Sequence, residues 1–191
     1  MKSERQEQII EEAIKIIDSK GIQGLTIKNM SKAIGISEPA IYRHFESKTH
    51  IIIAILEILQ ETAIRFSHMM ETKTGTAMDK ISFMLKSIVS IFIDKPSLIS
   101  VLFAEEIFKN EPVLEEKTVW VLNKNEETIE NILQKGKDEG NIPSDLDTSI
   151  LALLIMGSFR LLVKRWQMGN YNFDLERETD NLLTTLKKLI V

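Results

Sequence analysis

The chain of 191 residues contains no cysteine, and only 4 prolines, 8 glycines and 3 histidines. The absence of cysteine excludes a disulfide framework, a thiolate-bound zinc or iron–sulfur site and a thiol redox switch. The scarcity of proline and glycine disfavours a β-rich fold with many tight turns. A chain of this length buries enough apolar surface to fold without such cross-links.

Long apolar runs are also missing. The longest are Ile51–Leu56 and Ile150–Gly157, far short of the roughly 20 residues that a membrane span needs. Residues 1–12 are polar and charged, so they do not resemble a signal peptide. We therefore expect a cytoplasmic protein with no membrane contact.

The sequence lacks the common catalytic and metal-binding motifs. It has no HExxH pattern and no glycine-rich phosphate loop. His44, His50 and His68 are too far apart in sequence to form a pair on one helix face. We predict that the protein is not an enzyme and has no metal site and no cofactor.

Charge is distributed unevenly along the chain. The total formal charge is −4, but residues 24–50 carry a net +2 and residues 111–150 a net −6. Because nucleic acid attracts cations, any nucleic-acid binding is expected in the N-terminal quarter.

Apolar residues recur with helical spacing along the whole chain, and no strand-like alternation stands between turn residues. This pattern predicts an all-α protein of about nine helices. The segment at 51–56 is apolar on every side, which is typical of a buried helix. The expected helices cover residues 3–19, 26–33, 37–45, 47–71, 77–93, 97–109, 113–139, 145 or 147 to 167, and 174–190.

The segment Thr26–Ile51 reads as two short helices joined by a tight turn at Ile34–Gly35–Ile36. In a helix-turn-helix the second helix enters the DNA major groove. The expected core residues of this segment are Met30, Ala33, Ile36, Ile41 and Phe45.

Residues 35–48, GISEPAIYRHFESK, resemble the signature of the TetR family of transcriptional regulators. The resemblance implies a helix-turn-helix DNA-binding domain at residues 1–47 and a larger helical domain at 48–191 for ligand binding and dimerisation. It also implies a homodimer on a palindromic double-stranded operator. One departure is visible, because Thr49-His50 stands where the family usually has an acid.

Each residue expected at the DNA has its own reason. Thr26 begins a helix and could hold a phosphate, and Arg43 is the candidate for a bidentate guanine contact. The resemblance assigns phosphate contacts to Tyr42, His44 and Lys48, although Tyr42 could instead be a core aromatic. Lys28 could equally lie on a solvated face. The predicted DNA-binding residues are Thr26, Lys28, Ser37, Glu38, Pro39, Ala40, Tyr42, Arg43, His44 and Lys48.

The last two expected helices are predicted to pair with a second copy. Residues 150–163 are apolar on most sides, and Gly157-Ser158 would allow close approach of another helix. The resemblance implies a four-helix interface, with simple core packing as the alternative. The predicted interface residues are Leu154, Gly157, Ser158, Leu161, Leu182, Leu183 and Leu186.

The resemblance further implies a small-molecule pocket in the C-terminal domain. Polar residues on apolar stretches, such as Ser87, Asn123 and Arg160, are its best markers, but apolar helical residues generally belong to a packed core. The candidates are Phe83, Ser87, Phe92, Phe103, Trp120, Asn123, Met156, Phe159 and Arg160.

The resemblance implies that the protein represses transcription and that a small effector relieves the repression. The candidate pocket residues favour an effector that is largely apolar. The alternative keeps DNA binding but lets the bound protein act on a protein partner, as the nucleoid-occlusion inhibitor of this superfamily does. The acidic segment 111–150 would then be a docking face. Many dispersed DNA sites would favour the alternative, and a few sites beside promoters would favour repression.

Overall fold

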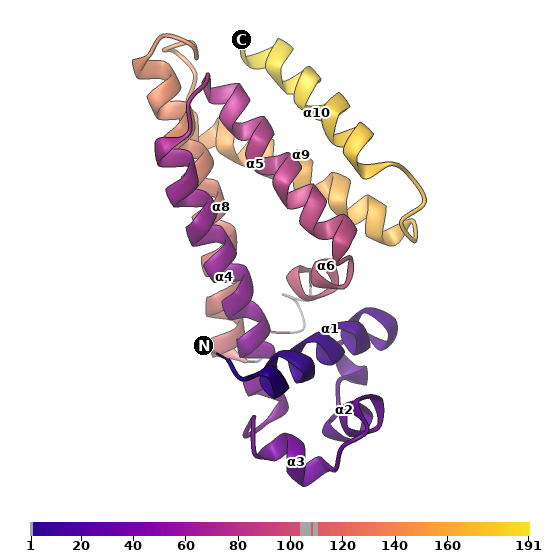
Figure 1. The fold of residues 1–191 in the computed structure, drawn as a ribbon. Coiled ribbons are helices and arrows are strands. Elements are labelled where there is room, and N and C mark those ends of the chain that lie inside the picture. Colours follow the sequence, from indigo (N-terminus) through magenta and orange to yellow (C-terminus); the bar gives the residue numbers. More distant parts are fainter. Residues whose placement is uncertain (1, 104–107, 109–110) are drawn as a thin grey trace. The chain divides into compact units, whose positions relative to one another are not determined.

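The computed structural model describes residues 2–103, 108 and 111–191. Within these residues there are nine α-helices and no strand (Figure 1), as the sequence predicts. Their bounds are α1 Glu4–Gly24, α2 Ile27–Ile34, α3 Glu38–Tyr42, α4 Lys48–Thr72, α5 Ala77–Asp94, α6 Ser97–Leu102, α8 Pro112–Asp138, α9 Thr148–Met168 and α10 Leu175–Ile190. Residues 104–107 and 109–110 of the helix predicted over 97–109 lie outside the described residues.

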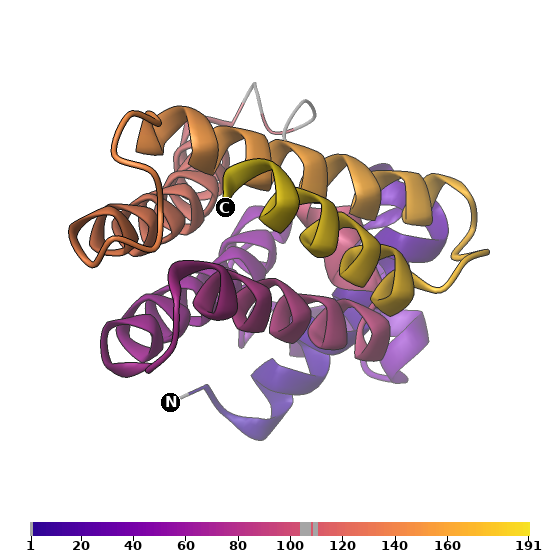
Figure 2. The ribbon, with the colours of Figure 1, turned by 90° about the horizontal axis from the view of Figure 1, so that it is seen from above.

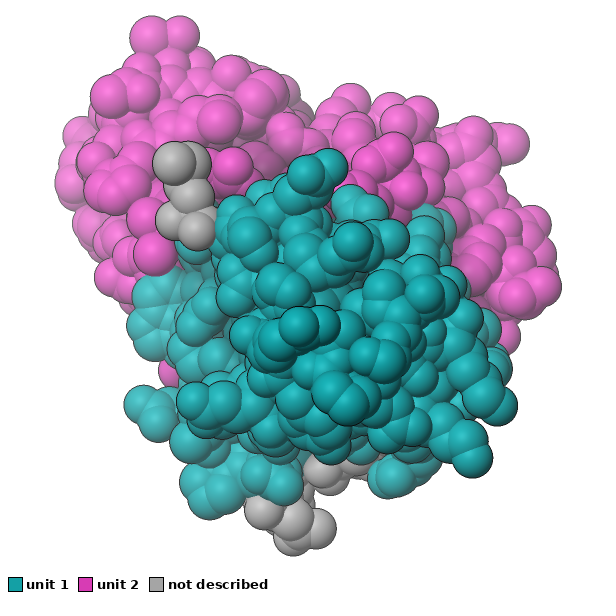
Figure 3. Space-filling model, turned by 60° about the horizontal axis from the view of Figure 1, so that its bottom comes forward, with its two compact units in different colours: residues 1–61, 96–120 teal, residues 62–95, 121–191 magenta. Residues whose placement is uncertain are grey.

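The chain divides into two compact units, coloured separately in Figure 3. Unit 1 contains residues 1–61 and 96–120, and unit 2 contains residues 62–95 and 121–191. Helices α4 and α8 each contribute to both units. The functional boundary expected after residue 47 stays a prediction.

Unit 1 is built around the apolar stripe of α1 and the first turns of α4. On α1, Ile9, Ala13 and Ile17 are almost completely buried, and the helix packs against α2 and α6. On α4, Ile51 and Ile55 are fully buried. The all-round apolar start of this helix is therefore core, as predicted, and it anchors α1–α3.

Unit 2 contains α5, α9 and α10, with α10 packed against the other two (Figure 2). The buried stripe of α10 includes Leu175, Leu183 and Leu186. An exposed ion pair between Lys86 of α5 and Asp180 of α10, at 2.7 Å, joins the two helices.

Residue Gly136 marks a close approach between α8 and the start of α5. A Cβ there would lie 2.6 Å from the Cβ of Ala77, so no larger residue fits without displacement. The amide of Ala77 also donates to Asn141 Oδ1 over 3.1 Å. Glycine at this position therefore determines how tightly the two helices pack.

No helix in the described part of the chain combines the length and hydropathy that crossing a membrane requires. Across the same residues, no three His, Asp or Glu side chains gather in a way that could hold a metal ion.

Candidate nucleic-acid interface

Helices α2 and α3 form the predicted helix-turn-helix in unit 1. Thr26 caps α2, and its Oγ1 accepts a hydrogen bond from the amide of Asn29 at 3.1 Å. Gly35 ends α2 in the left-handed region, with φ of 77°, where a residue without Cβ is favoured. Its N–H donates to the Ser31 carbonyl at 2.9 Å, and the chain reverses to bring α3 against α2.

Helix α3 is shorter than the predicted 37–45. After Tyr42 the Arg43 amide reaches the Pro39 carbonyl at 3.3 Å, and the His44 amide bonds three residues back, to the Ile41 carbonyl at 2.9 Å. The Phe45 amide closes the turn on the same carbonyl at 3.0 Å. The segment continues as a tight turn into α4. The residues predicted beyond Tyr42 therefore lie on a turn rather than on the helix.

The inner face of the motif is anchored in the core of unit 1. Met30 and Ile41 are fully buried, and Phe45 is 8% exposed, as predicted. Ile36 is only half-buried, and the prediction for Ala33 is wrong because its side chain is exposed. The inward face of α2 follows Ile27, Met30, Ser31 and Ile34, and Ala33 lies to one side of that face.

All ten predicted DNA-binding residues are reachable from solvent. Three of them, Ala40, His44 and Lys48, are half-buried. The ring of Tyr42 is 51% exposed, so the alternative of a core aromatic is not supported. The exposed members are Thr26, Lys28, Ser37, Glu38, Pro39, Tyr42 and Arg43.

Hydrogen bonds hold the turn after α3 in place. The side-chain amide of Gln6 in α1 donates to the His44 carbonyl at 3.4 Å. The ammonium of Lys48 donates to the Ile22 carbonyl at 3.3 Å. Two of its three N–H donors remain for another acceptor. No sequence pattern indicates this role of Gln6, because the contact joins residues 38 apart.

Thr49 and His50 stand at the start of α4, where the resemblance leads us to expect an acid. Ser47 caps α4, accepting from the His50 amide at 3.3 Å, and its Oγ lies 3.0 Å from His50 Nδ1. The imidazole therefore interacts with the cap hydroxyl, while the backbone cap itself is retained. This departure leaves the start of α4 intact.

Two short helices joined by a left-handed glycine, with a buried inner face and a solvent-exposed polar outer face, define a helix-turn-helix DNA-binding protein. Residues 9–55 match the profile described as bacterial regulatory proteins, tetR family. Residues 76–191 match the C-terminal region of the MAATS-type transcriptional repressors. The chain belongs to the tetR family and is a transcriptional regulator.

Individual relatives cover nearly the whole chain. The nucleoid occlusion factor SlmA of Haemophilus influenzae is 30% identical over 167 residues, covering 84% of this chain and 76% of that protein. The probable acrEF/envCD operon repressor of Escherichia coli is 24% identical over 191 residues, covering 97% and 86%.

Solved structures share the fold at low identity. The regulator FadR of Bacillus subtilis, in complex with stearoyl-CoA, has a TM-score of 0.82 at 23% identity and covers 97% of this chain and 99% of that one. The MbdR regulator of Azoarcus has a TM-score of 0.86 at 19% identity, covering 97% and 98%. These likenesses establish the arrangement of helices.

The nine residues predicted for a ligand pocket differ widely in solvent exposure. Phe92 and Phe159 are buried, whereas Phe83 and Trp120 are 39% and 38% exposed, and Asn123 is exposed as well. Phe103 and Trp120 belong to unit 1 and the other seven to unit 2. The half-buried members are Ser87, Phe103, Met156 and Arg160. The pocket stays a prediction.

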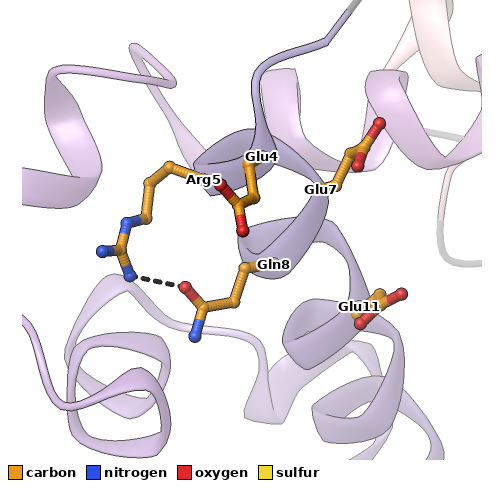
Figure 4. Close-up of a pocket in the computed structure, with 5 residues that line it drawn as sticks. All are labelled: Glu4, Arg5, Glu7, Gln8 and Glu11. Atoms are coloured by element: carbon orange, nitrogen blue, oxygen red, sulfur yellow. Dashed lines mark hydrogen bonds between the residues drawn. The ribbon is translucent and has the colours of Figure 1, made fainter.

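Two of these residues already have partners in unit 2. The Lys73 ammonium lies 3.7 Å from the centre of the Phe83 ring, and Ser87 Oγ donates to the Phe83 carbonyl at 2.8 Å. A separate surface depression lies along α1 and is lined by five polar side chains: Glu4, Arg5, Glu7, Gln8 and Glu11 (Figure 4). With three acids, it does not suit a largely apolar ligand.

The residues predicted for dimerisation fall into two groups. On α9, Leu154 and Leu161 are 57% and 61% exposed, and a Cβ on Gly157 would meet no atom within 4 Å. On α10, Leu183 and Leu186 are buried within their own chain. Ser158 and Leu182 are half-buried. Ile150 and Leu153 on the same helix are also exposed, at 53% and 54%. They are not among the predicted residues, although their helical spacing places them on the face of Leu154.

Proposed function

We propose that the protein is a homodimeric repressor that binds palindromic operator DNA through α2 and α3 and leaves it when a small, largely apolar effector binds. The observation that carries the DNA-binding part is the exposed polar face of the motif on an anchored inner face. In this proposal residues 1–47 bind DNA and residues 48–191 bind the effector and the second copy, in the cytoplasm and without enzymatic activity.

The contacts with DNA divide into positioning and reading. Tyr42, His44 and Lys48 supply donors to phosphate oxygens, which fix the orientation without reading sequence. Pro39 and Ala40 offer only shape and apolar contact, which suits a thymine methyl group. Arg43 is exposed, as a bidentate guanine contact would require.

The exposed face of α9 supports pairing with a second copy. Large apolar side chains rarely gather on the surface of a monomer unless they bind something. The most exposed are Ile150, Leu153, Leu154 and Leu161. A two-fold axis across this face would present two reading heads to two half-sites.

The open space around Gly157 supports the same pairing. Glycine inside a helix costs about 0.5–1 kcal/mol relative to alanine, and among the described residues no atom lies close enough to require it here. A second helix can cross closely at this point only because residue 157 has no Cβ. The exposed face and the glycine lie on the same helix, α9.

An apolar effector is supported by the kinds of proteins that share the fold. The C-terminal match is to transcriptional repressors, and the FadR structure holds stearoyl-CoA. An effector acts by preferring one of two conformations, so its differential affinity sets the change in DNA affinity. The candidate ligand residues are the nine named above. Those that are buried or half-buried in unit 2 are Ser87, Phe92, Met156, Phe159 and Arg160.

A second candidate function is supported by the SlmA relatives. The protein would then act on a protein partner while bound to DNA, with the acidic segment 111–150 as the docking face. This function needs many dispersed DNA sites, because each bound copy acts on the protein partner only near its own site.

Selection of genomic fragments by the purified protein at roughly physiological salt tests both. Repression predicts one or a few palindromic sites beside promoters, and added apolar acyl ligands should release the protein from those fragments in a fluorescence anisotropy titration. Numerous scattered sites would overturn repression in favour of the second function. Purification under denaturing conditions followed by refolding removes any bound ligand. If this ligand-free protein enriches no fragment, the DNA-binding proposal fails.

A further inference from the structure

Glu38 is the first residue of α3 and follows the N-cap residue Ser37. Its side chain is exposed, and no hydrogen bond or ion pair to its carboxylate is recorded among the described residues. The other acid of the helix-turn-helix, Glu46, lies 3.8 Å from His50 Nε2. Glu38 is therefore an unpaired acid at the N-terminal end of α3. In helix-turn-helix proteins, this end of the second helix contacts the base edges.

An acid in this place is unfavourable unless it gains something from DNA. The phosphate backbone repels a carboxylate, whereas the exposed cations of the same motif, Lys28, Lys32 and Arg43, attract phosphates. A carboxylate at a helix N-terminus is stabilised by the helix dipole, but α3 has only five residues, so this gain is small.

We propose that Glu38 is a specificity-determining residue whose carboxylate accepts a hydrogen bond from the N4 amino group of a cytosine in each half-site. An ionised carboxylate can only accept, so it must meet a base-edge donor. The major groove offers two such donors, the N4 amino group of cytosine and the N6 amino group of adenine.

The arrangement of groups along the groove favours cytosine. In an A·T pair the N6 donor stands between two acceptors, adenine N7 and thymine O4, which repel a carboxylate from both sides. In a G·C pair the N4 donor is at the end of the row, with acceptors on one side only. The carboxylate can approach N4 from the acceptor-free side.

The side chains next to Glu38 offer no competing acceptor for the cytosine amino group. Pro39 and Ala40 have no polar side-chain atoms, and Ser37 makes no side-chain cap hydrogen bond, so its hydroxyl adds no fixed acceptor. Glu38 is therefore the one anionic acceptor among residues 37–40. The inference rests on the proposed function, since it requires binding to operator DNA.

The test is in vitro selection from a randomised duplex library with three proteins: wild type, Glu38→Gln and Glu46→Gln. Glu46 is a matched control because it is an acid of the same motif with a side chain 88% exposed but lies outside α3. For wild type we expect one position per half-site that prefers cytosine about tenfold over other bases. Glu38→Gln keeps an acceptor oxygen but adds an NH2 donor that suits adenine N7, so it should shift the preference at that position from cytosine toward adenine. Glu46→Gln should leave the cytosine preference intact.

The outcomes separate the inference from the proposed function. If wild type enriches a motif that Glu38→Gln leaves unchanged while binding all sequences more tightly, the acid only repels phosphate and the inference is overturned. If wild type enriches no sequence, the proposed function fails and the inference fails with it. Circular dichroism of both variants checks that the motif is folded, and Glu38→Asp provides a second variant that retains the charge but shortens its reach.

Discussion

Ile41 and Tyr42 are neighbours in α3, yet the first is fully buried and the second is 51% exposed. The difference follows from helix geometry, because consecutive residues point about 100° apart. The buried member anchors the recognition segment and the exposed one is available to DNA. At the scale of the single residue, burial thus separates packing roles from contact roles.

We predict that Tyr42→Phe weakens operator binding about fivefold, by loss of one hydrogen bond. Lys48→Ala should weaken binding to all sequences and lower the salt slope of the binding constant by about one. Both effects are measured by anisotropy titration at several salt concentrations. Lys188→Ala, an exposed lysine of α10, is the matched control and should change neither. A loss confined to one base position would contradict the phosphate role.

A second prediction concerns Thr179, which is fully buried and whose Oγ1 has no hydrogen-bond partner. Thr179→Val keeps the shape and removes the unsatisfied hydroxyl, so it should raise the free energy of unfolding by about 1 kcal/mol. Thr128→Val in the same unit is the control, because its Oγ1 donates to the Lys124 carbonyl at 2.7 Å, and it should be destabilising. Urea unfolding measures both. A loss of stability in Thr179→Val would mean that the hydroxyl is paired in solution.

At the scale of the element, helix ends follow local chemistry. The helix α5 begins with a capping box, in which Thr76 Oγ1 donates to Asp79 Oδ2 at 2.7 Å and the Thr76 amide donates to the same oxygen at 3.1 Å. These hydrogen bonds hold the pKa of Asp79 below its ordinary value of 3.8. The sequence contains both residues at the required spacing, so this start was predictable.

The capping box predicts a pH dependence. A carboxyl with a lowered pKa in the folded state binds fewer protons there than in the unfolded chain, so its stabilisation is present above pH 3.8 and is lost as the pH falls through the lower folded value. Asp79→Ala should therefore be less stable than wild type at pH 7, by roughly 0.3–1 kcal/mol. The difference should shrink as the pH falls below 3.8. Unfolding at a series of pH values measures it, and a constant difference would refute the role of the ionised carboxylate.

The loop between α9 and α10 shows what local chemistry does not reveal. Asn170 and Tyr171 both have positive φ, 53° and 61°, which is unusual for residues with a side chain. Trp166 Nε1 donates to the Phe173 carbonyl at 2.9 Å, and the Trp166 and Tyr171 rings lie 4.7 Å apart. Aromatic packing holds the loop, and no turn motif in the sequence indicated this conformation.

At the scale of the whole molecule, the packing of a single chain does not account for the exposed apolar face of α9. Leu161 is 61% exposed and Leu183 is 5% exposed. Both were predicted in the same interface from their hydrophobicity. A charge at Leu183 would disrupt the core of its own chain, whereas a charge at Leu161 tests association directly.

We therefore predict that Leu161→Glu yields a folded monomer, since an interface does not tolerate an unpaired buried charge. Ile64→Glu, on α4 and 39% exposed, is the control and should remain a dimer. Analytical ultracentrifugation measures the mass, and circular dichroism checks the fold. A dimer that survives Leu161→Glu would exclude this face as the interface.

A related prediction distinguishes the stability of the single chain from the affinity of the dimer. Gly157→Ala should stabilise the isolated helix by about 0.5–1 kcal/mol, because a Cβ there meets no atom within 4 Å. The same methyl should weaken the dimer by holding the second helix away. In the Leu161→Glu variant, Gly157→Ala should raise the free energy of unfolding. In the otherwise wild-type chain, it should raise the dissociation constant of the dimer. An unchanged dissociation constant would place the helix crossing elsewhere.

The amino-acid sequence by itself determined that the described part of the chain is all helical, where most of its helices begin and end, and which segment forms the helix-turn-helix. These properties depend on local spacing, on caps such as Thr26 and on the left-handed Gly35. Only the tertiary structure decided that Ala33 points to solvent, that Gln6 holds the turn after α3, and that Leu183 is core while Leu161 is surface. Those outcomes depend on which helix faces meet, and this is determined by packing between segments far apart in the chain.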